Sequence, residues 1–152
     1  MSERETLKHE ALSSYPETVL IFDGEPEIVI DLREAILPPT KEGLTALGLD
    51  GPFAVLTSFN PFGENLSDED NARRFSHLEA ELRSAGLVYS GLDACSPDRD
   101  HCERSVAVCI ERGAALDIAR RWDQLAIFWF DLERFWIYGA ISLVDPISLP
   151  NN

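Results

Sequence analysis

Short apolar runs separated by polar turns mark both ends of the chain. Thr18–Phe22 and Glu27–Asp31 flank an Asp-Gly-Glu-Pro segment, which has the composition of a tight turn. Leu125–Phe130 and Phe135–Tyr138 flank Asp-Leu-Glu-Arg in the same way. Each pair predicts an antiparallel hairpin, and the second hairpin is densely aromatic.

Apolar residues at helical spacing predict a long helix in the middle of the chain. Its N-cap candidate is Ser67 and its stop is Gly86. The apolar positions between them follow a period of three to four residues: Ala72, Phe75, Leu78, Leu82 and Ala85. Shorter helices are expected over residues 3–14, from a Thr40 cap to near Gly48, and over 115–122.

The remaining apolar runs are expected to be strands, with one long polar loop between two of them. The strands are Phe53–Ser58, Leu87–Ser90 and Ser105–Ile110, and the loop is Gly91–Arg104. The tail, residues 145–152, is expected to fray. Helices mixed with two hairpins predict an α+β fold, a single compact domain over 1–152 with a mostly antiparallel sheet and helices packed on it.

Charge restricts the classes of partner. The chain has 13 basic and 27 acidic residues, a net charge of −14. An acidic surface repels phosphate backbones, so we expect no nucleic-acid partner, whereas a basic protein partner stays open. No apolar run reaches the ~20 residues of a membrane span, and the first residues are charged. We therefore expect no membrane partner and a cytoplasmic location.

The cysteines predict neither a metal site nor a disulfide framework. Their number is odd, three, which fits reduced thiols. Cys95, His101 and Cys102 lack the paired spacing of zinc ligands. Cys109 is expected in the core. The sequence contains no cofactor motif that we can identify, so no cofactor is expected.

Polar side chains gather where the Phe53–Ser58 run ends. Thr57 closes the run, and Pro61 forces Asn60 out of the α region into an extended or turn conformation. Asn71 lies four residues before Phe75, on the inward side of the long helix. The two amides either hold a polar ligand or satisfy each other and the loop backbone.

Two further polar residues flank predicted strands. Glu103 precedes the Ser105–Ile110 run, where a carboxylate can act as a general base or accept hydrogen bonds from loop N–H groups. Gln124 lies between a helix and a strand, where it can cap the chain reversal or contact a ligand.

These residues also carry a family resemblance. Leu56-Thr-Ser-Phe-Asn-Pro61, Ser67 with Asn71, Glu103 with Ser105, and Gln124-Leu-Ala-Ile-Phe-Trp129 resemble the bacterial DUF3293 family. The similarity runs from about Tyr15 to Tyr138. It implies a compact bacterial α+β domain and no particular activity.

We therefore expect a binding module rather than an enzyme. Its small polar pocket would be lined by Thr57, Asn60, Asn71, Glu103 and Gln124 and would take a ligand with amino, amide or base-edge groups. One alternative is a small hydrolase or transferase with Glu103 as general acid or base. Another is an acidic interaction domain that uses the aromatic hairpin 125–138, most simply in a homodimer.

Overall fold

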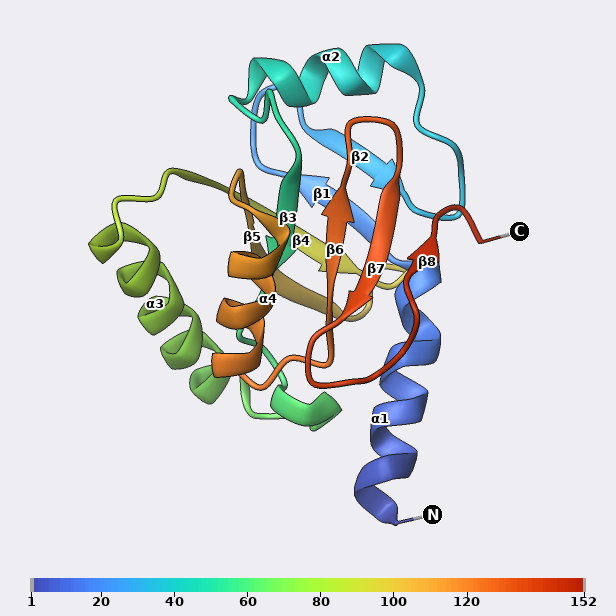
Figure 1. Cartoon of the computed structure of the whole chain (residues 1–152), viewed down its shortest axis with the longest axis vertical. Helices are drawn as coiled ribbons and strands as arrows, with labels where there is room; N and C mark the ends of the chain where they lie inside the picture. Colours follow the sequence, from blue (N-terminus) through green and yellow to red (C-terminus); the bar gives the residue numbers. More distant parts are fainter. Residues whose placement is uncertain (1, 152) are drawn as a thin grey trace.

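The computed structural model describes residues 2–151, which form one antiparallel sheet with helices around it (Figure 1). The strands are β1 Val19–Phe22, β2 Ile28–Asp31, β3 Phe53–Leu56, β4 Tyr89–Cys95, β5 Cys102–Val108, β6 Ala126–Phe130, β7 Phe135–Gly139 and β8 Ile147–Ser148. The helices are α1 Glu3–Ser14, α2 Pro38–Ala46, α3 Asp68–Ser84 and α4 Arg112–Arg121, with 3-10 turns η1 Tyr15–Glu17 and η2 Pro61–Gly63. The expected α+β class is confirmed.

The sheet curls, so that strands far apart in its order share one core. The spatial order is β2-β1-β4-β5-β3-β6-β7-β8. Ile30 of β2 and Leu20 of β1 nevertheless belong to the same buried cluster as Phe135 and Ile137 of β7. Leu44 of α2 joins this inner core, and Leu12 of α1 packs against it from the opposite end of the molecule (Figure 1).

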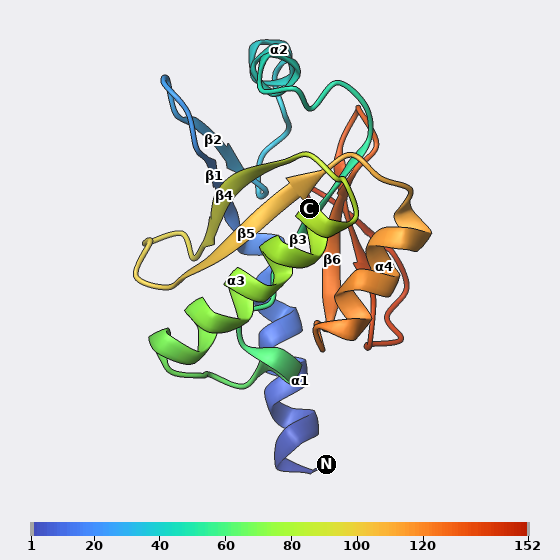
Figure 2. The same cartoon turned by 90° about the vertical axis from the view of Figure 1, so that its left-hand side faces the viewer.

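Helices α3 and α4 cover the outer face of the sheet (Figure 2). Side chains alternate along β3: Phe53 and Val55 face the inner core, whereas Ala54 and Leu56 face the helices. Helix α3 begins where expected, because the Ser67 hydroxyl accepts a hydrogen bond from Asp70 N at 3.1 Å. Gly86, at φ +73°, follows its last turn as predicted.

Both expected hairpins are present. Strand β1 pairs with β2, and β6 pairs with β7 in a register that places Trp129 opposite Trp136. All of β6 is buried, and so are Phe135 and Ile137 of β7. Trp136 and Tyr138 on the other face of β7 are half-buried. Most of the aromatic hairpin is therefore covered, which leaves little exposed aromatic surface for the interaction-domain alternative.

The prediction of a polar loop over Gly91–Arg104 is wrong. Most of it forms β4 and β5, which pair over seven residues around the turn at 96–101. Arg104 lies directly opposite Asp93 and binds it at 3.3 Å, while its other guanidinium nitrogen binds Asp23 of the β1–β2 connection. The guanidinium lies over Gly91, where any Cβ would collide with it. These ion pairs lie on one face of the strands, whereas Leu92 of β4 and Ala107 of β5 are buried in the inner core, so the pairs add cross-strand contacts to an ordinary buried face.

Three smaller expectations also differ from the structure. Helix α2 begins at Pro38 after a Leu37 N-cap, because proline at the first helical position needs no N–H partner, so Thr40 is not the cap. Residues 147–148 of the tail pair with β7, and Leu149 is buried in the inner core; Asn152 lies outside the described residues. Cys109 is exposed rather than in the core.

The expectation of three free thiols is contradicted. Cys95 and Cys102 are opposite each other in the β4–β5 register and form a disulfide. The sequence gives no sign of this pairing, because it depends on the unexpected β4–β5 hairpin. Within residues 2–151, no helix combines the length and the apolar character needed to cross a bilayer.

We expect alkylation of the native protein, followed by mass spectrometry, to label Cys109 and neither Cys95 nor Cys102. Reduction should lower the free energy of unfolding by about 2.5 kcal/mol, the chain-entropy value for so short a loop, measured by urea unfolding with and without a phosphine reductant. Cys109→Ser serves as the control and should not alter the response. Labelling of all three cysteines before reduction would contradict the disulfide.

Candidate functional site

The site is built around the chain segment that leaves β3 and leads to α3. Thr57 starts it: its hydroxyl donates to the Arg104 carbonyl of β5 at 2.7 Å and accepts from Phe59 N at 3.1 Å. Asn60 then adopts a left-handed backbone, φ +46°, a conformation that asparagine tolerates better than most residues. The segment is therefore tied to β5 at Thr57 and changes direction at Asn60.

Asn60 and Asn71 hold each other. The Asn60 backbone N–H donates to Asn71 Oδ1, and Asn71 Nδ2 donates to Asn60 Oδ1, both at 2.9 Å. Asn60 Oδ1 also accepts from Leu66 N at 3.0 Å. Of the two roles left open by the sequence, mutual satisfaction is the one that these contacts describe. Asn71, which is only 4% exposed, lies behind Asn60.

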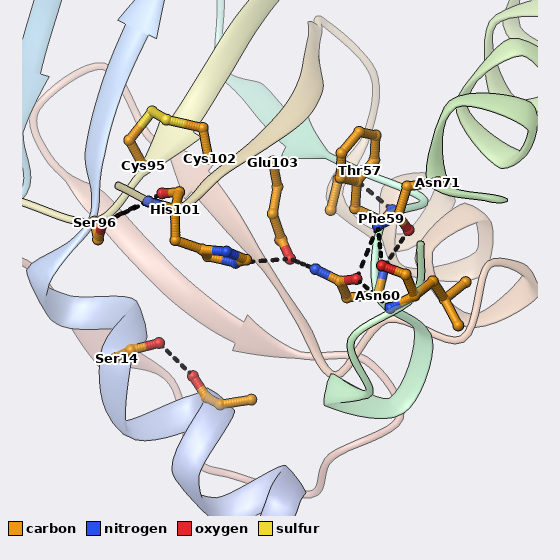
Figure 3. A network of polar contacts seen from close by, with 12 residues as sticks. Ser14, Thr57, Phe59, Asn60, Asn71, Cys95, Ser96, His101, Cys102 and Glu103 are labelled. Carbon is orange, nitrogen blue, oxygen red and sulfur yellow. Dashed lines mark hydrogen bonds and ion pairs between the residues drawn. A yellow bond between two sulfur atoms is a disulfide. The ribbon is translucent and has the colours of Figure 1, made fainter. Parts of the chain in front are cut away.

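The side-chain N–H group of Asn60 holds the carboxylate of Glu103 in place. Asn60 Nδ2 donates to Glu103 Oε2 at 2.7 Å, and His101 Nε2 lies 3.8 Å from the same oxygen (Figure 3). Glu103 Oε1 accepts no hydrogen bond from any side chain or backbone group of residues 2–151. One oxygen is thus held in place while the other keeps its capacity to accept.

Gln124 joins the same segment from the α4–β6 turn. Its Nε2 donates to the carbonyls of Phe59 and Trp122 at 2.9 and 3.1 Å. Arg74 of α3 spans the same gap, because it donates to the carbonyls of Ser58 and Trp122, each at 2.7 Å. Gln124 is only 5% exposed, and within the described chain its Oε1 accepts no hydrogen bond.

A cavity of about 420 Å³ opens between this segment, the β4–β5 turn and α1. Thr57, Asn60, Glu103 and Gln124 line it, and Asn71 does not. Four of the five residues selected from the sequence therefore meet at one cavity. Their role as ligand contacts stays a prediction.

The cavity also includes residues that the sequence did not single out for this purpose. Tyr15 of η1 lines it, with its ring 5.4 Å from that of Phe128. His101, considered in the sequence only as a metal ligand, lines it from the β4–β5 turn. Ser105 lines it two residues after Glu103, on the same face of β5. No local signal marks Tyr15, since only tertiary packing brings η1 to this place.

The pKa values of two side chains that line the cavity are shifted from their ordinary values. Burial raises the pKa of the Tyr15 phenol, and the negative charge of Glu103 adds to the rise. The hydrogen-bonding interaction with Glu103 raises the pKa of His101 above 6.5, against a smaller opposing effect of burial. Tyr15 is therefore neutral at physiological pH, and the charge of His101 is linked to Glu103.

Metal ligation has no site among these residues. Cys95 and Cys102 are bonded to each other, and residues 2–151 contain no group of three or more His, Cys, Asp or Glu side chains placed to hold a metal ion.

Comparison with known families identifies the middle of the chain. Residues 56–127 match the family model described as "Protein of unknown function (DUF3293)". This match confirms the resemblance to the DUF3293 family over these residues. All five residues selected from the sequence lie in the matched segment, whereas Tyr15 lies outside. Comparisons with curated proteins and with solved structures found no match.

Within the matched segment, Asn60→Ala and Asn71→Ala should each destabilise the protein by about 1–3 kcal/mol, because each leaves partly buried partners without a hydrogen bond. Urea unfolding of each variant against wild type measures the loss. Asn65→Ala is the matched control: Asn65 is exposed at the same cavity, and its side chain makes no hydrogen bond with the described residues. Equal, negligible effects of all three substitutions would refute the scaffolding role.

The His101 titration gives a second test. Because its folded pKa is raised, the stability that charged His101 contributes is fully present below its unfolded pKa and is lost as pH rises through the folded pKa. An NMR titration should show that Glu103→Gln lowers the pKa of His101. Glu133→Gln, at the β6–β7 turn, should leave it unchanged. An identical His101 pKa in wild type and Glu103→Gln would rule out the coupling.

Proposed function

We propose that the protein is a binding module that takes a small ligand with amino, amide or base-edge groups into the 420 Å³ cavity. The observation that carries the proposal is the arrangement of Glu103: one oxygen is held by Asn60 at 2.7 Å, and the other is left to accept from a ligand. Pre-organised acceptors in a concave, partly apolar site are typical of small-molecule binding.

The five residues selected from the sequence then take two different roles. Glu103 and Gln124 offer acceptor oxygens to the ligand. Asn60 and Asn71 are positioning residues, which hold the Glu103 carboxylate and the loop, and Thr57 fixes the loop to β5 through the Arg104 carbonyl. This division follows from which polar atoms are already hydrogen-bonded within the protein.

Binding of adenine and of benzamide, followed by ¹H–¹⁵N NMR, tests the proposal. We expect shifts at the Gln124 side-chain amide and at Glu103 for at least one probe, and at least tenfold weaker binding to Glu103→Gln, as expected for loss of a hydrogen bond to a charged group. Glu133→Gln is the matched control, because its side chain makes no hydrogen bond or ion pair with the described residues. Shifts confined to other parts of the molecule, or equal binding to both variants, would reject it.

The enzyme alternative has one observation in its favour. His101 Nε2 lies 3.8 Å from Glu103 at the cavity, which brings two groups capable of proton transfer together. An enzyme would convert a bound probe, whereas a binding module would release it unchanged.

Location and partners stay part of the proposal. A cytoplasmic bacterial protein with no nucleic-acid or membrane partner fits the acidic composition. Cytosolic reductants would keep Cys95 and Cys102 as thiols, so the redox state of the pair in cells bears on that location. A homodimer or a basic protein partner is the remaining partner hypothesis.

A further inference from the structure

Acidic residues outnumber basic ones in the lining of the cavity. Glu10 of α1, Glu17 of η1 and Glu103 of β5 all line it. The lining contains no lysine or arginine, and His101 is its one ionisable group that can become positive. Three carboxylate residues along one cavity create a field that favours a cation over an anion.

The neighbouring cations point elsewhere. Arg4 lies 4.0 Å from the centre of the Phe62 ring and 3.5 Å from Glu64, and Lys8 lies over the same ring. Arg104 alternates with Glu103 along β5, so it emerges on the opposite face and binds Asp23 and Asp93. The chain therefore uses its local basic residues outside the cavity.

Two side-chain oxygens that line the cavity accept no hydrogen bond within the described residues. Only 5% of Gln124 is exposed, yet its Oε1 accepts no hydrogen bond from residues 2–151. Glu103 Oε1 is likewise available, and both residues line the cavity. An acceptor oxygen that lines a cavity and has no hydrogen bond within the protein is suited to an N–H donor supplied from outside.

The rest of the wall is apolar and partly aromatic. Val55, Ala126 and Phe128 are buried residues of the inner core that reach the cavity, and the Tyr15 ring packs on Phe128. Leu7 and Ala11 of α1 close the other side. A flat apolar group fits between such walls, and the cavity volume is in the range of small-molecule sites.

We infer that the ligand is a protonated amine joined to a flat, apolar body, with the ammonium beside Glu103 and Gln124 and the body between Tyr15, Phe128 and α1. This inference rests on the proposed binding function and narrows its ligand class. The carboxylates of the lining favour an ammonium over a neutral amide. The apolar wall favours a ligand with an apolar body over a small hydrophilic cation.

Isothermal titration calorimetry with three indole probes tests the charge selection. Tryptamine carries an ammonium, indole-3-acetamide is its neutral counterpart and indole-3-acetate its anionic one. We expect tryptamine to bind at least tenfold more tightly than the amide, and the acetate to show no binding. Raising the salt concentration should reduce the preference, because exposed Glu10 and Glu17 contribute through a screened field.

Variants locate the effect. Glu103→Gln should remove most of the tryptamine preference while changing amide binding less, and the control Glu133→Gln should leave all three probes unchanged. Circular dichroism checks that Glu103→Gln is folded. If it is not, Glu10→Gln, on the exposed face of α1, provides the second variant and should weaken tryptamine binding alone.

The outcomes separate this inference from the function on which it rests. Equal or tighter binding of the amide would overturn the cation selection and leave the binding module standing. Binding of no probe, together with no binding of adenine or benzamide, would overturn both. Tryptamine binding that Glu103→Gln and Glu10→Gln do not affect would place the amine at another site and also overturn the inference.

Discussion

The backbone that leaves β3 must find hydrogen-bond partners outside the sheet, and the side chains that provide them organise the site. Asn71 accepts from Asn60 N, Thr57 accepts from Phe59 N, and Asn60 accepts from Leu66 N. Gln124 and Arg74 donate to the carbonyls on the same path. Unpaired backbone N–H and C=O groups in a partly buried segment cost free energy. These side chains are therefore held in place by the fold itself, without a ligand.

That constraint also sets the position of the acidic group. Once Asn60 Oδ1 is held by Leu66 and Asn71, its Nδ2 points to Glu103 and holds one carboxylate oxygen. The alternation of β5 then separates charges: Glu103 faces the cavity, and Arg104 faces Asp23 and Asp93. Asn60 and Asn71 thus serve as a scaffold that orients the Glu103 carboxylate.

The cavity lies where α1, η1 and η2 pack against one end of the curled sheet. Helix α1 has no buried residue and rests on η2, where Ala11 approaches Gly63 closely enough that an added Cβ would lie 3.0 Å away. Gly63 has φ +78°, so glycine is favoured there for its backbone as well as for this contact. The wall that α1 provides therefore depends on side-chain and backbone fit at η2 rather than on a buried apolar stripe.

Sequence alone determined the elements whose signals are local: both hairpins, the Ser67 cap and Gly86 stop of α3, and the α+β class. It also selected Thr57, Asn60, Glu103 and Gln124, which the fold brings to one cavity. Tertiary structure decided the rest. Strands β4 and β5 carry the Asp93–Arg104–Asp23 ion pairs on one face and bury Leu92 in the inner core on the other, and the charged residues of Gly91–Arg104 conceal this alternation in the sequence. The Cys95–Cys102 bond and the place of His101 follow from that hairpin, and Tyr15 reaches Phe128 only because the sheet curls, since contacts between distant segments leave no periodic trace in either one.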